Sequence, residues 1–178
     1  MPALSTPLLG ANVNQVTAGT TTNGQNAQFA LGTEIVGSDG NTYRYVQAGA
    51  AISTTTNEPF ALGIDEAEQA TILTGTNALA GYLIGFAPRL IIADNAFFWA
   101  RMRGVFPIRV AASVAADVAL GLPSTTDGRL NTAPTTVSAT NAVILGVQIT
   151  AAASASASAG NTIRTAIATR PMAKRPTL

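Results

Sequence analysis

Apolar and polar positions alternate in short runs along this chain, and turn residues separate the runs roughly every ten residues. No stretch sustains the 3.6-residue apolar spacing of an amphipathic helix. Short alternating runs bounded by Gly, Pro, Asn and Asp are typical of strands in barrels and sandwiches. We therefore predict an all-β fold, with a single β-barrel or β-sandwich domain.

Two Asp-Gly turns give the clearest local signals, at Ser38–Asn41 and at Thr126–Arg129. Such turns supply the positive φ angles that a tight hairpin needs. After the first turn, Tyr43 and Tyr45 fall on one face of a strand and the residues between them fall on the other. The pattern predicts a hairpin whose second strand is an exposed, half-buried ribbon.

Residues 95–110 alternate most strongly. One face carries two aromatic and two basic side chains, from Phe97, Trp99, Arg101 and Arg103. The other face carries apolar side chains, from Phe98, Ala100 and Met102. We expect a strand here that Gly104 and Pro107 interrupt.

The other runs predict shorter elements. Residues 64–74 are compatible with a short helix or with a strand, a loop and a strand. A turn is expected near Ala116–Asp117, and strands are expected at 141–150 and 161–170. The Ala/Ser tract at 151–159 is too uniform in side-chain size to pack specifically, so we expect a loop there.

No linker divides the chain. The Thr/Asn/Gln/Gly-rich start and the proline-broken, basic end lack the strand pattern of the middle. We divide the sequence into an extended N-terminal arm (1–28), a β-rich domain (29–170) and a C-terminal arm (171–178).

Charge is scarce. Charged residues make up 11% of the chain, against about 25% in an average protein. A surface with few ionic groups loses little free energy when neighbouring chains cover it, which favours assembly. The net charge of +1 gives no long-range field that would attract the chain to a nucleic acid or an anionic membrane.

The chain contains neither Cys nor His, which removes thiol nucleophiles, common zinc sites and Ser-His-Asp triads. The acidic group Asp65, Glu66 and Glu68 could hold a hard cation or act as an acid and base. We interpret it as a solvated loop or helix start, because the spacing of a calcium-binding loop is absent. We therefore predict no catalytic, cofactor-binding or metal-binding residue, and no enzyme.

Membrane association is not expected either. No run of about 20 apolar residues is unbroken. Residues 1–4 lack the basic region and long apolar stretch of a signal peptide, so export by that route is not expected.

Arginine accounts for nine of the ten basic residues, and its planar fork suits fixed hydrogen bonds across interfaces. The candidate interface residues are Trp99, Arg101, Arg103, Arg109, Arg170, Lys174 and Arg175. Alternatives stay open for each part of this set. Trp99 could instead belong to the core. The strand that carries Arg101, Arg103 and Arg109 could have a solvated face, or it could bind single-stranded nucleic acid by stacking. The basic residues at 170–175 could belong to a disordered tail or to an arm that reaches an acidic neighbour.

Several phrases of the sequence resemble the head decoration, or cement, proteins of tailed bacteriophages. The phrases are LGTEIVGSDGNTYRYVQAGAAI (31–52), FFWARMRGVFPIRVAASVAADVALGLPSTTDGRL (97–130) and AVILGVQIT (142–150). Together they hold 65 of the 178 residues. The polar N-terminal region and the tract at 151–159 lie outside the resemblance.

This resemblance implies a β-rich protein, made in the host cytoplasm, that binds the outer surface of an icosahedral capsid between capsomers. It implies two partners, the major capsid protein and further copies of the chain. A homotrimer is favoured and a homodimer is the alternative. It implies no catalytic residue, no cofactor and no direct contact with nucleic acid, and a role in reinforcing the head against packaged DNA.

Three other functions remain open from the sequence. The chain could be a tail or fibre-attachment protein of the virion. It could be a polysaccharide-degrading spike domain, which would need paired carboxylates in a cleft. It could also be a barrel that binds single-stranded nucleic acid, although a net charge of +1 makes a poor phosphate track.

Overall fold

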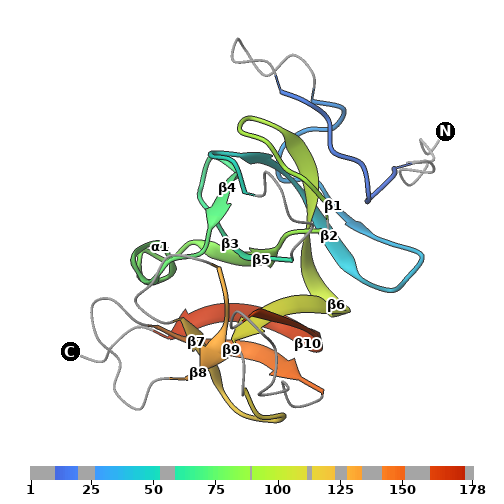
Figure 1. Ribbon diagram of the computed structural model, residues 1–178. Coiled ribbons are helices and arrows are strands. Elements are labelled where there is room, and N and C mark those ends of the chain that lie inside the picture. The colour runs from blue at the N-terminus through green and yellow to red at the C-terminus, as the bar shows by residue number, and fades with distance from the viewer. Residues whose placement is uncertain are drawn as a thin grey trace, which may run out of the picture.

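The protein is described by a computed structural model (Figure 1). The structure describes residues 11–19, 27–52, 59–88, 90–111, 114–122, 128–133, 142–150 and 161–174. The predicted Ala/Ser loop at 151–159 and the first half of the predicted turn at 126–129 lie outside these residues, and Gly128 has a φ of 63°.

Strands dominate the described residues, so the all-β prediction is confirmed. The strands are β1 (Glu34–Val36), β2 (Thr42–Ala48), β3 (Ala61–Ile64), β4 (Gln69–Ile72), β5 (Leu83–Phe86), β6 (Phe97–Ala111), β7 (Leu120–Leu122), β8 (Asn131–Thr132), β9 (Ala142–Ile149) and β10 (Asn161–Lys174). One short helix, α1 (Gly75–Leu79), lies between β4 and β5.

Five strands close into a barrel in the order β2-β4-β3-β5-β6, and β6 pairs back to β2. The β2–β4 contact is parallel and the other pairings are antiparallel. Small and branched side chains fill the interior, because the barrel is too narrow for many large ones. They include Val46, Ala48, Leu62, Ile64, Ala70 and Ala100, and they pack beside the larger ring of Phe98.

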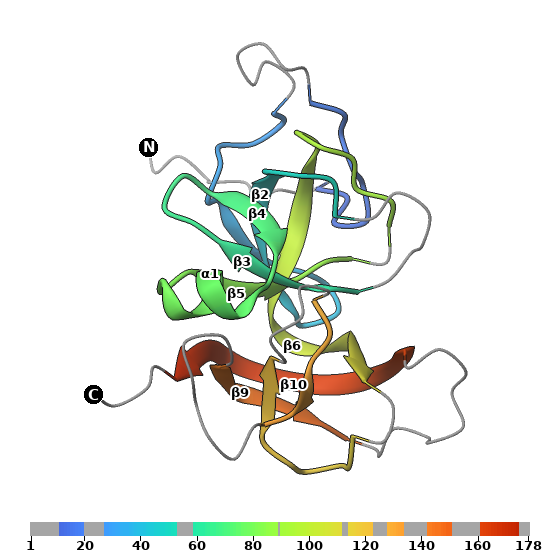
Figure 2. The same ribbon diagram turned by 60° about the vertical axis from the view of Figure 1, so that its left-hand side comes forward.

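The 15-residue strand β6 belongs to two layers. Its first half pairs with β2, and its second half pairs with β10 in a second sheet of order β6-β10-β9-β7-β8. A bridge between Val110 and Leu130 brings the far end of this sheet back to β6. Figures 1 and 2 show the barrel above the second sheet, with β6 passing from one to the other.

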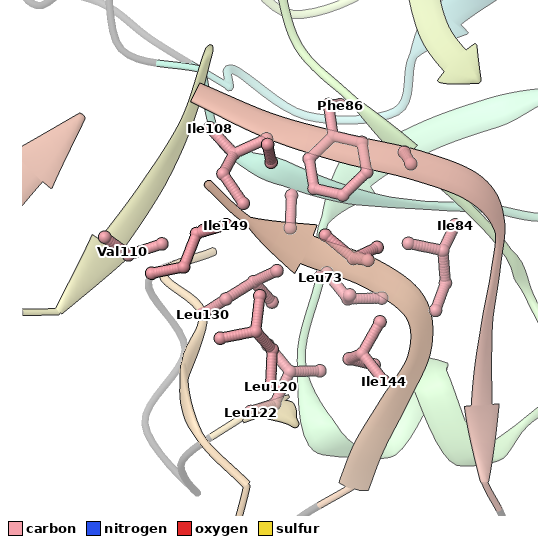
Figure 3. Close-up of a cluster of buried hydrophobic side chains, with 14 of the residues drawn as sticks. Leu73, Ile84, Phe86, Ile108, Val110, Leu120, Leu122, Leu130, Ile144 and Ile149 are labelled. Carbon is pink, nitrogen blue, oxygen red and sulfur yellow. The ribbon is translucent and has the colours of Figure 1, made fainter. Parts of the chain in front are cut away.

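One hydrophobic core joins the two layers (Figure 3). Ile84 and Phe86 of β5 and Leu73 before α1 contribute from the barrel side. The second sheet contributes Ile108, Val110, Leu120, Leu122, Leu130, Ile144 and Ile149. Because both layers bury apolar area in the same cluster, separating them would expose it to water.

The helix prediction over 64–74 is wrong, and its strand-loop-strand alternative is correct. Strands β3 and β4 form a hairpin in which Leu62 pairs with Ile72. The helix begins later, because Thr74 and Asn77 form a capping box. The Thr74 hydroxyl accepts the Asn77 amide at 3.2 Å, and the Asn77 side chain accepts the Thr74 amide at 2.7 Å.

The hairpin predicted around Ser38–Asn41 is confirmed, and Gly40 has a φ of 77°. The turn predicted at Ala116–Asp117 is also present, with a φ of 60° at Asp117. The prediction that β2 is a half-buried ribbon is wrong, since its two tyrosines are each 2% exposed and its opposite face lies in the barrel.

Gly104 and Pro107 do not interrupt β6, contrary to the sequence prediction. Gly104 has a φ of 119°, and the pairing with β2 changes register just before it. Pro107 lies opposite Thr165 of β10. The Arg109 amide bonds Pro59 on the other side of β6, so at Pro107 the missing N–H points to a side that β10 does not occupy.

Parts of both predicted arms lie on the domain itself. Thr17 forms a bridge with Phe97, the first residue of β6, and Ala11, Val13 and Val16 pack against the buried clusters of the domain. At the other end, β10 continues past Pro171 to Lys174, because a bulge between Ala168 and Met172 accommodates the proline. Residues 1–10, 20–26 and 175–178 lie outside the described part of the chain.

Candidate interaction surfaces

An aromatic cluster occupies the outer face of β2 and β6. The rings of Tyr45 and Trp99 lie 4.9 Å apart, and Phe29 lies 5.3 Å from Tyr45 and 5.1 Å from Trp99. Tyr43 and Phe97 complete the cluster, and the segment at 11–13 packs over it. Trp99 is 2% exposed, so the interpretation of Trp99 as core is the one that fits.

The candidate arginines do not form one patch. Arg101 lies partly buried, with its guanidinium 5.9 Å from the Phe106 ring, and Arg103 is exposed. Arg109 stacks on the Phe60 ring at 4.6 Å. Six strand positions separate Arg103 from Arg109, which is about 20 Å, so the two side chains serve different surfaces.

The remaining candidates lie at the end of the chain. Arg170 falls in the β10 bulge, and Lys174 is the last residue of β10, opposite Val143. The structure describes the backbone but not the side chains of these two residues, and Arg175 lies outside it. The last residues of β10, 172–174, pair with β9, so this end of the strand is fixed.

The acidic group splits into separate roles. The Asp65 carboxylate accepts the amides of Ala67 and Gln69 at 2.9 and 2.8 Å, which closes the β3–β4 turn. Glu66 is exposed, and Glu68 pairs with Arg44. Within the described residues, no group of three or more acidic or other metal-binding side chains could hold an ion.

Arg44 joins three segments around one mouth of the barrel. Its guanidinium bonds Glu34 of β1 at 2.7 Å, and it bonds both carboxylate oxygens of Glu68, with the Nε contact at 2.7 Å. The bonds to Glu68, and those to Glu34, raise the Arg44 pKa although burial lowers it. The forked geometry fixes the β1–β2 hairpin against the β3–β4 loop.

A second polar network ties the same hairpin to the middle of β6. The buried Asn41 side chain accepts the Val105 amide at 2.8 Å and donates to Asp39 at 2.7 Å. The Tyr43 hydroxyl also donates to Asp39. Burial acts to raise the pKa of Asp39, but these hydrogen bonds favour the carboxylate and hold that pKa below its usual value. Burial and the bond to Asp39 raise the pKa of Tyr43.

Two adjoining hollows form a groove beside this mouth, and we call them the acidic hollow and the apolar hollow. The acidic hollow, of about 620 Å³, is lined by Asp65, Glu66 and Glu68, by Tyr82 and by residues 80–81. The apolar hollow, of about 640 Å³, is lined by Ile35, Val36, Ile84, Met102, Arg103 and Pro171. Arg44 and Leu83 line both hollows, so the two hollows adjoin at these residues.

The outer face of β6, β10 and β9 is open, and we call it the open sheet face. Val105 lies opposite Ile167, and Leu145 lies opposite Met172. These four side chains are 41–56% exposed. The sequence showed the Ile163–Thr165–Ile167–Thr169 face of β10, but it did not show that the inward face would be the alanines Ala166 and Ala168.

No helix in the described part of the chain is long and apolar enough to cross a membrane. No model of a known protein family matches the sequence, and no curated protein matches it. Function is therefore inferred from the groove, the open sheet face and the resemblance of the sequence to head decoration proteins.

Proposed function

We propose that this chain is a structural protein of a bacteriophage head, which binds the outer capsid surface and cements adjacent capsomers. The observation that carries the proposal is the open sheet face, where apolar side chains at 41–56% exposure lie on regular, paired strands. Exposed apolar patches on a rigid sheet mark surfaces that bind other proteins. The resemblance of residues 31–52, 97–130 and 142–150 to decoration proteins supports the same function.

The chemistry of the open sheet face suits attachment to a protein shell. Thr165, Thr169 and Gln148 separate its apolar side chains, so the face combines apolar contact area with neutral hydrogen-bonding groups. Burying such a surface requires the desolvation of few ions. A sheet of this kind, bordered by the carboxylate of Asp117 that bonds Gln148, can lie across a seam between two capsomers with little long-range repulsion from either.

Cementing needs strong attachment from contacts that are individually modest. When several copies are joined, each further contact forms at a high effective concentration, which raises the overall affinity by orders of magnitude. The proposed partners are therefore the major capsid protein and further copies of this chain, as a trimer or alternatively a dimer.

Quantitative mass spectrometry of purified particles, and of heads separated from tails, tests the proposal. We expect hundreds of copies that remain with the heads, counted relative to the major capsid protein. A handful of copies that separate with the tails would instead indicate a tail or fibre-attachment protein. Absence from the particle would overturn both virion proposals.

A substitution tests the open sheet face directly. Ile167→Lys places a charge at its centre, and we expect at least a tenfold loss of binding to expanded empty shells, measured by co-sedimentation. Ile91→Lys is the matched control, because Ile91 is 52% exposed outside the open sheet face. Equal binding by the two variants would show that another surface contacts the shell.

The nucleic-acid alternative draws little support from the described residues. Phe97 and Trp99, which would stack on bases, are 1% and 2% exposed. The arginines of β6 are divided between different surfaces. Binding of labelled oligonucleotides at low salt would nevertheless revive this alternative.

A further inference from the structure

We propose that the groove beside Arg44 binds the basic C-terminal segment 174–178 of a second copy of this chain. The segment has the sequence Lys-Arg-Pro-Thr-Leu, with two adjacent cations followed by a proline and a leucine. This inference rests on the self-association that belongs to the proposed function, and it names the surfaces that would mediate it.

The groove and the segment match in charge. Asp65 and Glu66 lie in the acidic hollow, and Glu66 is exposed with no hydrogen bond or ion pair among the described residues. Lys174 and Arg175 would bring two positive charges to this end. The attraction adds a specific orientation, because in the apolar hollow Glu34 is already paired with Arg44 and Arg103 adds a positive charge.

The groove and the segment also match in polarity along their length. Leu83, which lines both hollows, is 47% exposed, and Val36 at the far wall is 72% exposed. An extended chain rises about 3.3 Å per residue, so Leu178 would lie about 10 Å beyond Arg175. That spacing carries the leucine from the acidic hollow to the apolar side chains of the next hollow.

Strand β1 gives an extended segment a place to bind. It pairs only with β2 among the described strands, so its other edge is open. Glu34 and Val36 of β1 line the apolar hollow. An extended segment can add to such an edge through its backbone, while its side chains occupy the hollow.

The position of α1 indicates that the segment comes from a second copy. Strand β10 ends beside α1, and Ala173 packs on the same cluster as Ala78 of that helix. In both views α1 lies between the end of β10 and the β3–β4 loop, which carries the acidic side chains (Figures 1 and 2). Four residues span at most about 14 Å, and a helix with its side chains is 10–12 Å across. Strand β10 touches the apolar hollow at Pro171, but residues 172–174 then pair with β9 and carry the chain end to α1. Residues 175–178 of the same chain are therefore too short to turn back to the groove, or to cross α1, and then lie along both hollows.

Each copy would donate one segment and accept one. Such an exchange closes into a dimer or a trimer, because every groove is then filled and no segment is left over. The open sheet face takes no part in the exchange and stays available for the capsid.

The first experiment compares the full chain with a variant that ends at Lys174. The variant keeps every residue of β10, so circular dichroism and urea unfolding should match those of the full chain. By sedimentation equilibrium we expect the full chain to form a dimer or trimer and the shortened chain to dissociate at least tenfold more readily. Equal association of the two chains, or a monomeric full chain, would overturn the proposal.

Charge reversal locates the contact. Glu66→Lys should weaken association at least tenfold, and Arg175→Glu should do the same, whereas the double variant should recover it because the pair is restored with opposite sense. Asp94→Lys is the matched control, an exposed acidic residue outside both hollows. Weakening by Asp94→Lys to the same degree would show that only net charge matters.

A peptide experiment distinguishes a groove filled by the chain's own segment from a groove filled by the segment of a second copy. A fluorescent peptide of residues 170–178 should bind the shortened chain, lose affinity as salt rises and fail to bind the Glu66→Lys form. If the full chain is monomeric and excludes the peptide, its own segment fills the groove and the second-copy proposal is wrong. These measurements contain no capsid, so their failure leaves the shell-binding result of Ile167→Lys independent.

Discussion

Strand β6 serves both layers of the molecule, and its outer face is covered along the first half and open along the second. Over residues 97–99 the chain's own segments at 11–13 and 29–35 seal an aromatic cluster. Over residues 105–111 the same strand pairs with β10, and the outer side chains Val105 and Ile167 remain in contact with solvent. Large aromatic rings thus stand where the fold supplies its own cover, and aliphatic and threonine side chains stand where it does not.

The difference between the covered and the open half of β6 distinguishes residues that stabilise the fold from residues that are available to bind a partner. The covered half buries large rings, which makes it a determinant of the folded state. The open half buries Phe106 and the alanines and aliphatics of its inner face, so its outer side chains can change without disturbing the core. Substitutions in the two halves should therefore give opposite patterns of stability and attachment.

The largest contrast is expected between Trp99→Ala and Ile167→Ala. Removing the indole from the sealed cluster leaves a cavity, and we expect a loss of about 3–5 kcal/mol in the free energy of unfolding. Ile167→Ala should change it by less than about 0.5 kcal/mol. Urea unfolding followed by circular dichroism measures both, since Trp99 is the sole tryptophan and fluorescence would be lost with it. A similar loss in both variants would mean that the two halves do not differ.

The junction of the halves is the next test. A Cβ on Gly104 would lie 1.9 Å from the Asn41 side-chain oxygen, at a φ of 119°. We expect Gly104→Ala to cost about 3 kcal/mol or more, combining backbone strain with the clash. Gly40→Ala is the matched control, because its φ of 77° is strained but nothing lies within 4 Å of the added Cβ. That variant should lose only about 1–2 kcal/mol, and equal losses would show that the clash is relieved at no cost.

Asn41 is expected to have a smaller effect than either of these. Asn41→Ala leaves the Val105 amide without its acceptor at the start of the open half, and we expect a loss of about 2 kcal/mol. Exposed Asn14→Ala should fall within about 0.5 kcal/mol of the parent. If Asn41→Ala also increases amide hydrogen exchange in residues 104–106 but not in 97–99, the network acts at the junction rather than on the whole strand.

The smallest effect is a dependence on pH from Asp39. Its folded-state pKa lies below the unfolded value, so the carboxylate stabilises the fold above about pH 4, and this stabilisation is lost as the pH falls through the folded pKa. Asp39→Asn should therefore lose less stability than the parent between about pH 4 and 2, by less than about 1 kcal/mol because the site is partly solvated. Tyr43→Phe removes one of the bonds to this carboxylate and should show part of the same change in urea unfolding. An unchanged slope in Asp39→Asn would mean that the network does not favour the charged form.

Local pattern predicted much of the fold because strand alternation and turn chemistry act between near neighbours. The Asp-Gly turn at Ser38–Asn41 and the alternation of residues 97–102 could be read without any other part of the chain. The candidate site was less predictable. The candidate arginines are close in sequence, but Arg101 lies near the Phe106 ring of its own strand, whereas Arg109 stacks on Phe60 from a distant segment.

The sequence by itself determined the all-β class, the hairpin and which side chains share a face of each strand. Tertiary structure decided which of those faces are covered. Trp99 is core because Phe29 packs on its ring and Val13 packs against the same cluster, and β6 continues through Gly104 because Asn41 supplies an acceptor for the Val105 amide. Alternation reports only that two faces differ, whereas burial depends on contacts between segments far apart in the chain, and local pattern does not encode those contacts.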